Sequence, residues 1–336
     1  MNPERISIYY DLMRIGIGSE SVKLFQGAPK RFYRINGACF MLETSLGKYA
    51  LWLISDEESR LIDELKLLDI LQKNRIEGFL YPIHLKNNRC YGHLEDGRFF
   101  YITSWHELRR ISYRNDIRSL LKLITDFRMA ICSSEASFLM KAPLKSLVDR
   151  YQDMIKYVNS FAMLASHRLY PTVFDQVFLK HWGEFVNEAE LALKLIRSCA
   201  YLSLFGAKES FRPIINNFSR SNLGVLPNGQ VICISLKERA LDAPLMDLAL
   251  LMVKTARANH WNQEWYDKTI EVYNESFPLT NEELGILRAY LAFPWEMYRL
   301  AARYYHNRVN WPVSVFVEKM KRILESKAER DKLLEL

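Results

Sequence analysis

The chain has 336 residues, of which 49% are hydrophobic and 13% are aromatic. This length and composition suit one large domain or two lobes with a substantial core, and they exclude disorder of the whole chain. The net charge of +7 is modest, and acidic residues are interspersed with the basic ones. That pattern favours a solvated surface, with contact to an acidic partner or to nucleic acid as the alternative.

No apolar run approaches the roughly 20 residues needed to span a bilayer, and the N-terminal stretch has no extended apolar core typical of a secretory signal. We therefore expect the chain to fold in the cytosol of the cell that makes it. The spacing Cys90-x-x-His93 is the only metal-like pair. Because no second pair accompanies it, we interpret the five cysteines as small buried hydrophobic residues and predict no metal site: Cys39, Cys90, Cys132, Cys199 and Cys233.

The N-terminal region predicts two paired strands. Residues 1–30 are weakly patterned, and Gly16-x-Gly18 is more typical of a turn than of a phosphate-binding loop. Residues 31–44 alternate as a strand does, Gly47 and Lys48 supply a turn, and residues 49–54 pair back as a second strand.

An amphipathic helix is predicted over residues 55–73. Ser55 and Glu58 fit a capping box at its start, and Glu64 is interpreted as a solvated charge. The apolar stripe consists of leucines at helical spacing: Leu61, Leu65, Leu68 and Leu71.

Two further strands are predicted at residues 89–94 and 98–104, joined by the hairpin signal Glu95-Asp96-Gly97. Beyond Trp105 the hydrophobic pattern becomes helical. The predicted helices of that region cover residues 115–134, 144–161 and 172–199. Their apolar stripes are typical of a packed core.

Residues 211–247 carry the densest set of turn and strand signals. A strand ending at Ile215 runs into the polar loop 216–222, and apolar strands at 223–226 and 231–234 flank a Pro-Asn-Gly turn. Asp242-Ala243-Pro244 then opens a helix over residues 245–253. Later helices are predicted at 262–276, at 280–306 with a capping box from Thr280 to Glu283, and at 319–336.

This layout resembles the active centre of the aminoglycoside-phosphotransferase-like kinases, most closely the spore coat protein S (CotS-type) family. A second resemblance to that family is the ordered set Phe293-Pro294, Arg303-Tyr304-Tyr305 and Trp311. The resemblance covers about residues 30–325 and implies an α+β, two-lobed, protein-kinase-like fold. The small N-terminal lobe would comprise residues 1–104, and the larger helical lobe residues 105–336, with a degenerate catalytic loop at 214–237.

The resemblance also shows which catalytic groups are substituted. The family's phosphate-binding lysine corresponds to Trp52, and its catalytic aspartate corresponds to Asn217. Its metal-binding Ile-Asp-Phe-Asp segment corresponds to residues 234–237, where Ser235 and Lys237 replace the two aspartates. Asn222 matches the asparagine that helps to hold magnesium in the family. Asp247 matches a later aspartate of the family, which would cap or charge the start of its helix.

These substitutions argue against phosphoryl transfer, which depends on metal ions, a phosphate clamp and a carboxylate base. Asn217 carries no charge and cannot act as a base, Ser235 is a weak ligand for magnesium, and Lys237 would repel it. We therefore predict no catalytic residue, no cofactor, and no nucleotide binding.

Two functions follow from the resemblance. The first is a non-catalytic, pseudokinase-like structural or scaffold protein of the bacterial endospore coat, made in the mother-cell cytosol and deposited on the spore with other coat proteins. The alternative is a small-molecule phosphotransferase or nucleotide-binding protein that uses the substituted groups. The sequence does not identify the coat partners, the oligomeric state or the assembly step.

Trp52 is predicted to face the nucleotide cleft. Side chains alternate along a strand, so Ala50, Trp52 and Ile54 share one face. The related kinases direct their lysine into the cleft from this position. We expect the indole to fill the nucleotide space and to pack against the hairpin at residues 223–234.

Overall fold

The computed structural model describes residues 3–35, 38–55, 57–132, 145–199, 201, 203 and 211–336. The chain divides into two compact units that are not contiguous in sequence. The sheet unit comprises residues 1–111, 126–141 and 219–238, and the helical unit comprises residues 112–125, 142–218 and 239–336. The lobe boundary at Ser104 stays a prediction.

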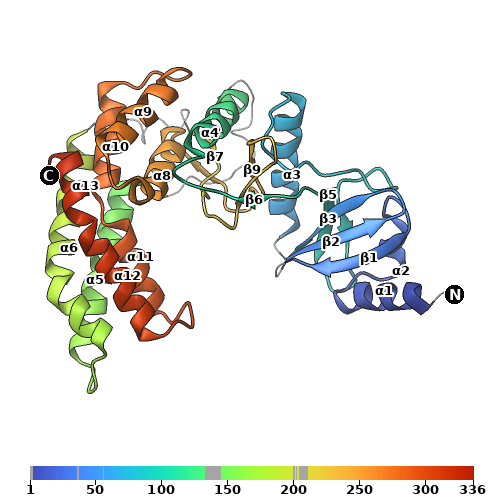
Figure 1. Ribbon diagram of the computed structural model, residues 1–336, viewed down its shortest axis with the longest axis horizontal. Helices are drawn as coiled ribbons and strands as arrows, with labels where there is room; N and C mark the ends of the chain where they lie inside the picture. Colours follow the sequence, from blue (N-terminus) through green and yellow to red (C-terminus); the bar gives the residue numbers. More distant parts are fainter. Residues whose placement is uncertain are drawn as a thin grey trace. The chain divides into compact units, whose positions relative to one another are not determined.

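The sheet unit is built on a five-stranded antiparallel sheet with the order β1-β2-β3-β5-β4 (Figure 1). A smaller sheet in the same unit has the order β6-β8-β9, and β8 and β9 are the arms of the predicted hairpin. The strands are β1 (Pro29–Arg34), β2 (Cys39–Thr44), β3 (Lys48–Ile54), β4 (Gly92–His93), β5 (Phe99–Ser104), β6 (Arg109–Arg110), β8 (Leu223–Val225) and β9 (Val231–Cys233).

Strand alternation divides the apolar side chains of the larger sheet between two cores. Leu51 and Leu53 of β3 belong to one core, which also contains Leu12 and Phe25 from the N-terminal region. The other core contains Ala50 and Trp52 of β3 together with Leu61 of α3 (Glu58–Lys73) and Ile232 of β9. The predicted assignment of alternate β3 residues to opposite faces is therefore confirmed.

The N-terminal region differs from the prediction in two ways. Residues 31–44 are not one strand, because β1 ends at Arg34 and β2 begins at Cys39, and the two strands pair as a hairpin. Residues 1–30 contain two helices, α1 (Pro3–Arg14) and α2 (Ser19–Lys23). Burial of Leu12 against the sheet stabilises this region, and such tertiary packing leaves little local sequence signal. The expected turn at Gly16 is confirmed by its φ of 90°.

The predicted capping box of α3 is wrong. The helix begins at Glu58, and its N-cap residue, Glu57, makes no side-chain hydrogen bond to the helix. The Glu58 carboxylate instead accepts a hydrogen bond from the Tyr91 hydroxyl at 2.8 Å. The leucine stripe is confirmed, with Leu61, Leu68 and Leu71 buried.

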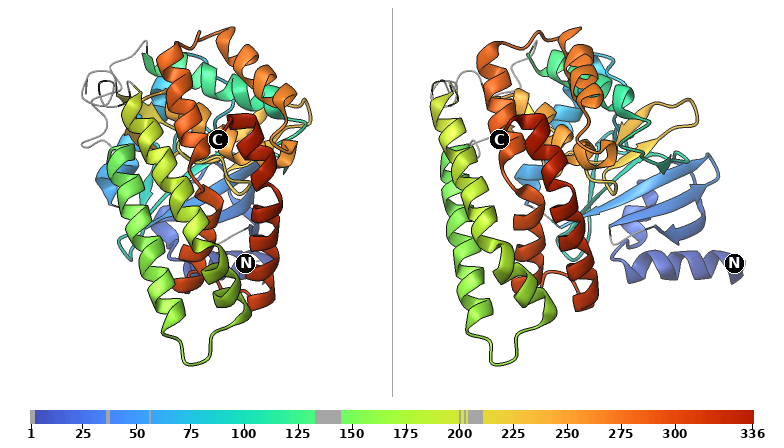
Figure 2. Two further views of the ribbon diagram at one scale, coloured as in Figure 1. Left: turned by 90° about the vertical axis from the view of Figure 1, so that its left-hand side faces the viewer. Right: turned by 60° about the vertical axis from the view of Figure 1, so that its left-hand side comes forward.

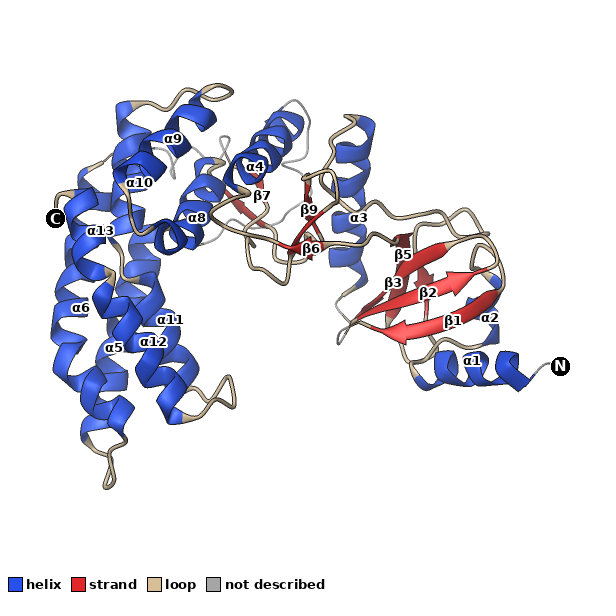
Figure 3. Cartoon of the chain, viewed as in Figure 1, coloured by secondary structure: helices blue, strands red, loops and turns tan. Residues whose placement is uncertain are grey.

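The helical unit contains most of the helices and a two-stranded sheet of β7 and β10 (Figure 3). Figure 2 shows α5, α6, α11 and α12 running side by side. The elements are α5 (Leu147–Ser166), α6 (Val173–Ser198), β7 (Arg212–Ile214), β10 (Ala240–Asp242), α8 (Leu245–Ala256), the 3₁₀ turn η3 (Arg257–Asn259), α9 (Gln263–Asn274), α10 (Asn281–Ala292), α11 (Trp295–Tyr305), α12 (Val313–Glu325) and α13 (Lys327–Leu334). Helix α4 (Ile117–Cys132) begins in this unit and ends in the sheet unit.

Two predicted helices are each divided in the structure. The range 280–306 is interrupted at Phe293 and Pro294, because a residue before proline disfavours the helical conformation and Phe293 has a ψ of 134°. The charged C-terminal helix is two helices, α12 and α13. The capping box from Thr280 to Glu283 is confirmed. Residues 133, 134 and 144, at the ends of other predicted helices, lie outside the described residues.

Aromatic residues dominate the core between α5, α6, α11 and α12. Phe174 of α6 contacts Tyr304 and Tyr305 of α11, with ring centroids 4.3 and 6.2 Å apart. The fully buried Asp175 accepts hydrogen bonds from the Tyr305 hydroxyl and from the Arg168 guanidinium. The two tyrosines of the Arg-Tyr-Tyr motif are therefore packed against the core, whereas Arg303 is exposed. Among the cysteines, Cys39 and Cys233 are buried as predicted, Cys90 and Cys199 are only partly buried, and Cys132 at the end of α4 is exposed.

Candidate functional site

A cavity of about 870 Å³ lies within the sheet unit, next to β3 and β5. Its volume falls within the range of small-molecule pockets. Four residues that correspond in sequence to kinase catalytic positions line it: Trp52, Asn222, Ser235 and Lys237. Trp105 and His106, which follow β5, also line it.

Trp52 forms part of the cavity wall and is 9% exposed. Its indole N–H donates a hydrogen bond to the Thr103 hydroxyl at 3.2 Å, and its ring stacks on Tyr101 at a centroid distance of 6.3 Å. The core cluster that contains Trp52 also contains Ile232 of β9, and Ile234 packs against this cluster. The predicted packing against the hairpin is confirmed. The prediction that Trp52 fills the space is wrong, because the ring lies flat against neighbours in the sheet and leaves the cavity beside it.

Asn222 holds the two ends of the β8–β9 hairpin together. Its side-chain oxygen accepts the Ser235 N–H at 3.0 Å, and its side-chain nitrogen donates to the Ser235 carbonyl, also at 3.0 Å. The Ile234 N–H in addition donates to the Asn222 carbonyl at 2.9 Å. Asn222 is buried, and its amide is therefore engaged with the protein's own backbone.

Glu64 of α3 is buried at 5% exposure, so its prediction as a solvated charge is wrong. Its carboxylate accepts the Leu236 N–H at 3.1 Å and a longer hydrogen bond from the Ser235 hydroxyl at 3.4 Å. A sequence signal for this burial exists. Glu64 lies three residues after Leu61 and four before Leu68, on the same helix face as the apolar stripe.

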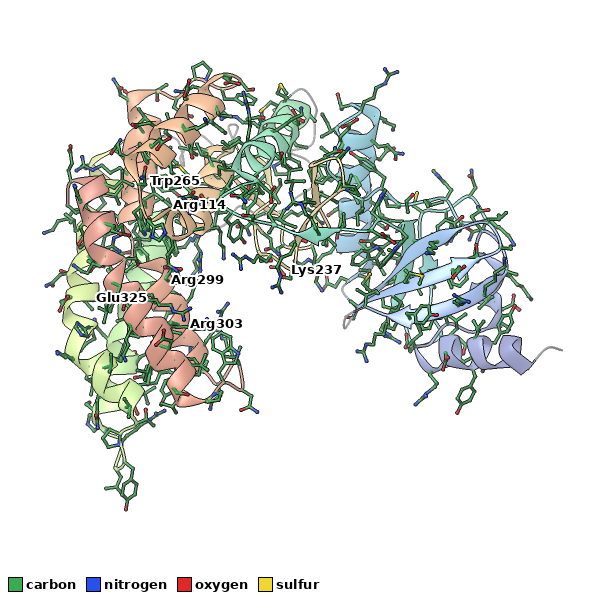
Figure 4. The ribbon with its side chains drawn as sticks, viewed as in Figure 1. Arg114, Lys237, Trp265, Arg299, Arg303 and Glu325 are labelled. Atoms are coloured by element: carbon green, nitrogen blue, oxygen red, sulfur yellow. The ribbon has the colours of Figure 1, made fainter. Side chains whose placement is uncertain are left out.

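Lys237 lines the same cavity and is exposed (Figure 4). Its backbone N–H donates to the Ser235 hydroxyl at 3.1 Å. The side chain contributes a positive charge to the cavity wall.

Asn217 follows a tightly held turn in the helical unit. Asn216 has a left-handed φ of 57°, which asparagine tolerates better than most residues. The two oxygens of Asp247 accept the N–H groups of Ile215 and Asn216 at 2.8 and 3.0 Å. Asp247 therefore fixes the loop before Asn217. The sequence predicts only a role at the start of its own helix, where Asp247 does lie in the first turn of α8.

Burial sets the protonation of Asp247. The side chain is 4% exposed, and burial raises its pKa from 3.8 to about 7. The hydrogen bonds from Asn216 and Ile215 lower the pKa, and the nearby charge of Asp242 raises it. Asp242 itself has a pKa raised to about 6, again mainly by burial.

Within the described residues, no group of three or more histidine, cysteine, aspartate or glutamate side chains is arranged to hold a metal ion. Within the same residues, no helix is both long enough and apolar enough to cross a bilayer.

Comparison with solved structures identifies the class of fold. The chain is similar to an aminoglycoside phosphotransferase from Alicyclobacillus acidocaldarius subsp. acidocaldarius DSM 446, with a TM-score of 0.81 and 17% identity over 94% of this chain and 93% of that chain. It is similar to the AMP-bound spectinomycin phosphotransferase, with a TM-score of 0.70 and 13% identity over 98% and 96% of the two chains. It is also similar to the amicoumacin kinase hAmiN, with a TM-score of 0.63 and 9% identity over 97% of each chain. No protein-family model matches the chain.

The chain therefore has the aminoglycoside-phosphotransferase-like kinase fold, with an antiparallel sheet in the N-terminal region and a mainly helical C-terminal region. This confirms the predicted fold class. At these identities the similarity establishes the fold and leaves the activity to the residues of the site.

Replacing Trp52 by alanine should lower the free energy of unfolding by about 3–5 kcal/mol, because a large buried aromatic side chain is lost. Trp52→Phe keeps most of the ring but loses the hydrogen bond to Thr103, and should cost less. Urea denaturation of the wild type and both variants measures these differences. An alanine variant as stable as the wild type would show that Trp52 is not part of the core.

Stability should depend on pH through Asp247. Its folded-state pKa of about 7 lies above the unfolded value of 3.8, so its contribution to stability is largest below about pH 4 and is lost as the pH rises through about 7. Asp247→Asn lacks this contribution. The destabilisation caused by the substitution should therefore be larger at about pH 4 than at about pH 8, as measured by urea denaturation at constant ionic strength. A difference that does not change with pH would contradict the raised pKa.

Proposed function

We propose that the protein is a non-catalytic, pseudokinase-like structural or scaffold protein of the bacterial endospore coat. The observation that carries the non-catalytic part is Trp52. At the position where the related kinases bind phosphate with a lysine, this chain has a buried indole bonded to Thr103. An indole offers one hydrogen-bond donor and no positive charge, so it cannot replace the phosphate clamp.

The metal-binding positions support the same proposal. The amide of Asn222 bonds to both backbone groups of Ser235, and the Ser235 hydroxyl lies between Glu64 and the Lys237 N–H. Magnesium prefers carboxylate and water oxygens in regular octahedral geometry. Binding it here would require breaking buried hydrogen bonds next to a lysine.

The coat assignment rests on the resemblance at residues 293–311. Its aromatic residues pack in the helical unit, where Trp295 and Phe293 lie 4.6 Å apart by ring centroids and Tyr304 packs on Phe174. These residues maintain the fold, as expected of a motif shared by structural proteins. Other coat proteins would be the partners, and the mother-cell cytosol would be the site of synthesis.

The alternative is a small-molecule phosphotransferase or nucleotide-binding protein with substituted catalytic groups. The cavity of about 870 Å³ beside Trp52 favours this alternative, since it offers room for a ligand. The similar spectinomycin phosphotransferase has been solved with AMP, and with ADP and spectinomycin.

Calorimetry with Mg-ATP at millimolar concentration should show no heat beyond dilution, because the phosphate and metal clamps are absent. Asn217→Asp should restore no phosphate transfer, since one carboxylate does not replace the missing lysine and metal ligands. The spectinomycin phosphotransferase is a positive control for both assays. Saturable binding that requires magnesium would favour the alternative function.

The coat assignment predicts a location. A fluorescent fusion produced in a sporulating host should collect around the forespore, and the untagged protein should be recovered in coat extracts of mature spores. A matched cytosolic protein, expressed from the same promoter, controls for trapping. Uniform fluorescence in the mother cell with no protein in the coat extract would argue against the assignment.

A further inference from the structure

The helical unit contains a second cavity, of about 420 Å³, lined by residues before and at the start of α4, by the end of η3 and the turn after it, and by one face of α9. It shares no lining residue with the cavity beside Trp52. Its walls combine charged and apolar side chains, and the ones used below are Arg114, Arg118, Leu121, His260, Glu264, Trp265, Lys268 and Thr269.

Positive charge predominates at the mouth of this cavity. Arg114, Arg118 and Lys268 are exposed lining residues, against the single carboxylate of Glu264. Arg118 has a distant ion-pair partner, Glu275, at 4.0 Å. Within the described part of the chain, Arg114 and Lys268 have no ion-pair partner. Two cations are therefore available to an anionic ligand.

Two helices also begin at the cavity. Helix α4 starts at Ile117 and α9 starts at Gln263, after the N-cap residue Asn262, and residues from both starts line the space. The N-terminal end of a helix carries partial positive charge and stabilises nearby anions. These helix ends add to the charge of the side chains.

The inner wall is apolar apart from one donor. Leu121, Trp265 and Thr269 are buried there, and the Thr269 hydroxyl is already bonded to the Trp265 carbonyl at 2.7 Å. The indole N–H of Trp265 is buried and has no acceptor in the described residues. A buried donor without an acceptor is costly, so a ligand that brings an acceptor to this wall would relieve the cost.

The turn beside this wall is strained. His260 and Trp261 are consecutive residues with left-handed φ values of 53° and 47°, which are uncommon for side chains of this size. His260 is the C-cap of η3, and residues held in such conformations cluster at active sites and ligand-binding sites. Figure 4 labels Arg114, which precedes α4, and Trp265 of α9, and both residues line the cavity.

We propose that this cavity binds a small organic anion, in which a carboxylate or phosphate group is attached to an apolar body of aromatic size. The anionic group would lie at the mouth with Arg114 and Lys268, and the apolar body would lie against Leu121 and Trp265. The site is separate from the proposed function and does not depend on it.

Calorimetry of the full chain with 1-naphthyl phosphate, 2-naphthoate and neutral 2-naphthol tests the proposal. One or both anions should bind saturably, and 2-naphthol should bind at least about tenfold more weakly, because it lacks the charge. The anion that binds more tightly shows whether the site prefers a phosphate or a carboxylate head group. If neither anion binds at millimolar concentration, or 2-naphthol binds as well as both, the proposal is wrong.

Paired variants locate the binding. Arg114→Gln/Lys268→Gln should weaken binding of the anion by at least about tenfold, since charged hydrogen-bond partners are lost. Lys180→Gln/Arg308→Gln removes the same two types of charge from exposed positions outside the cavity and should leave the affinity unchanged. Equal losses in the two double variants would overturn the proposal by indicating a general charge effect.

The indole of Trp265 provides a second readout. In a proton–nitrogen NMR spectrum its N–H signal is identified as the one absent from Trp265→Phe. That signal should shift on addition of the anion to the wild type and should not shift in Arg114→Gln/Lys268→Gln at the same concentration. If the signal stays unchanged at saturation, the anion binds elsewhere and the proposal is wrong.

Discussion

The hydrogen bonds between the Asn222 side chain and the Ser235 backbone are the constraint on which the walls of the larger cavity depend. The backbone of one residue presents one donor and one acceptor, and an asparagine amide complements both, which an ionised aspartate could not do. Once Ser235 is fixed, its hydroxyl donates to Glu64 and accepts the Lys237 N–H, and the Leu236 N–H also donates to Glu64. Helix α3 is thereby joined to the β8–β9 hairpin within the sheet unit.

Two buried carboxylates, one in each unit, serve the same physical purpose. Glu64 accepts the Leu236 N–H, and Asp247 accepts those of Ile215 and Asn216. Loops cannot satisfy their own backbone groups as helices and sheets do, so such acceptors stabilise a loop's conformation without any ligand. These contacts therefore stabilise the two loops independently of any chemistry that the loops perform.

Sequence patterns predicted correctly those elements whose conformation depends on residues close together in the chain. The Pro-Asn-Gly hairpin, the capping box of α10 and the alternation along β3 all depend on neighbouring residues. Helix α1 depends on tertiary packing, so the sequence pattern did not reveal it. The burial of Glu64 has a local signal in its position on the leucine face of α3, although a charged residue is by itself more typical of a solvated surface. At the site, the orientation of Trp52 followed from strand geometry. The free volume beside it did not, because a cavity is a property of the whole packed unit.

Trp52 also limits what a single substitution can introduce at this position. A lysine at position 52 would leave a void where the indole packs and would place an ammonium group among Ala50, Leu61 and Tyr101. Both effects are destabilising. A cation at this position would therefore require repacking of the surrounding core in addition to the substitution itself.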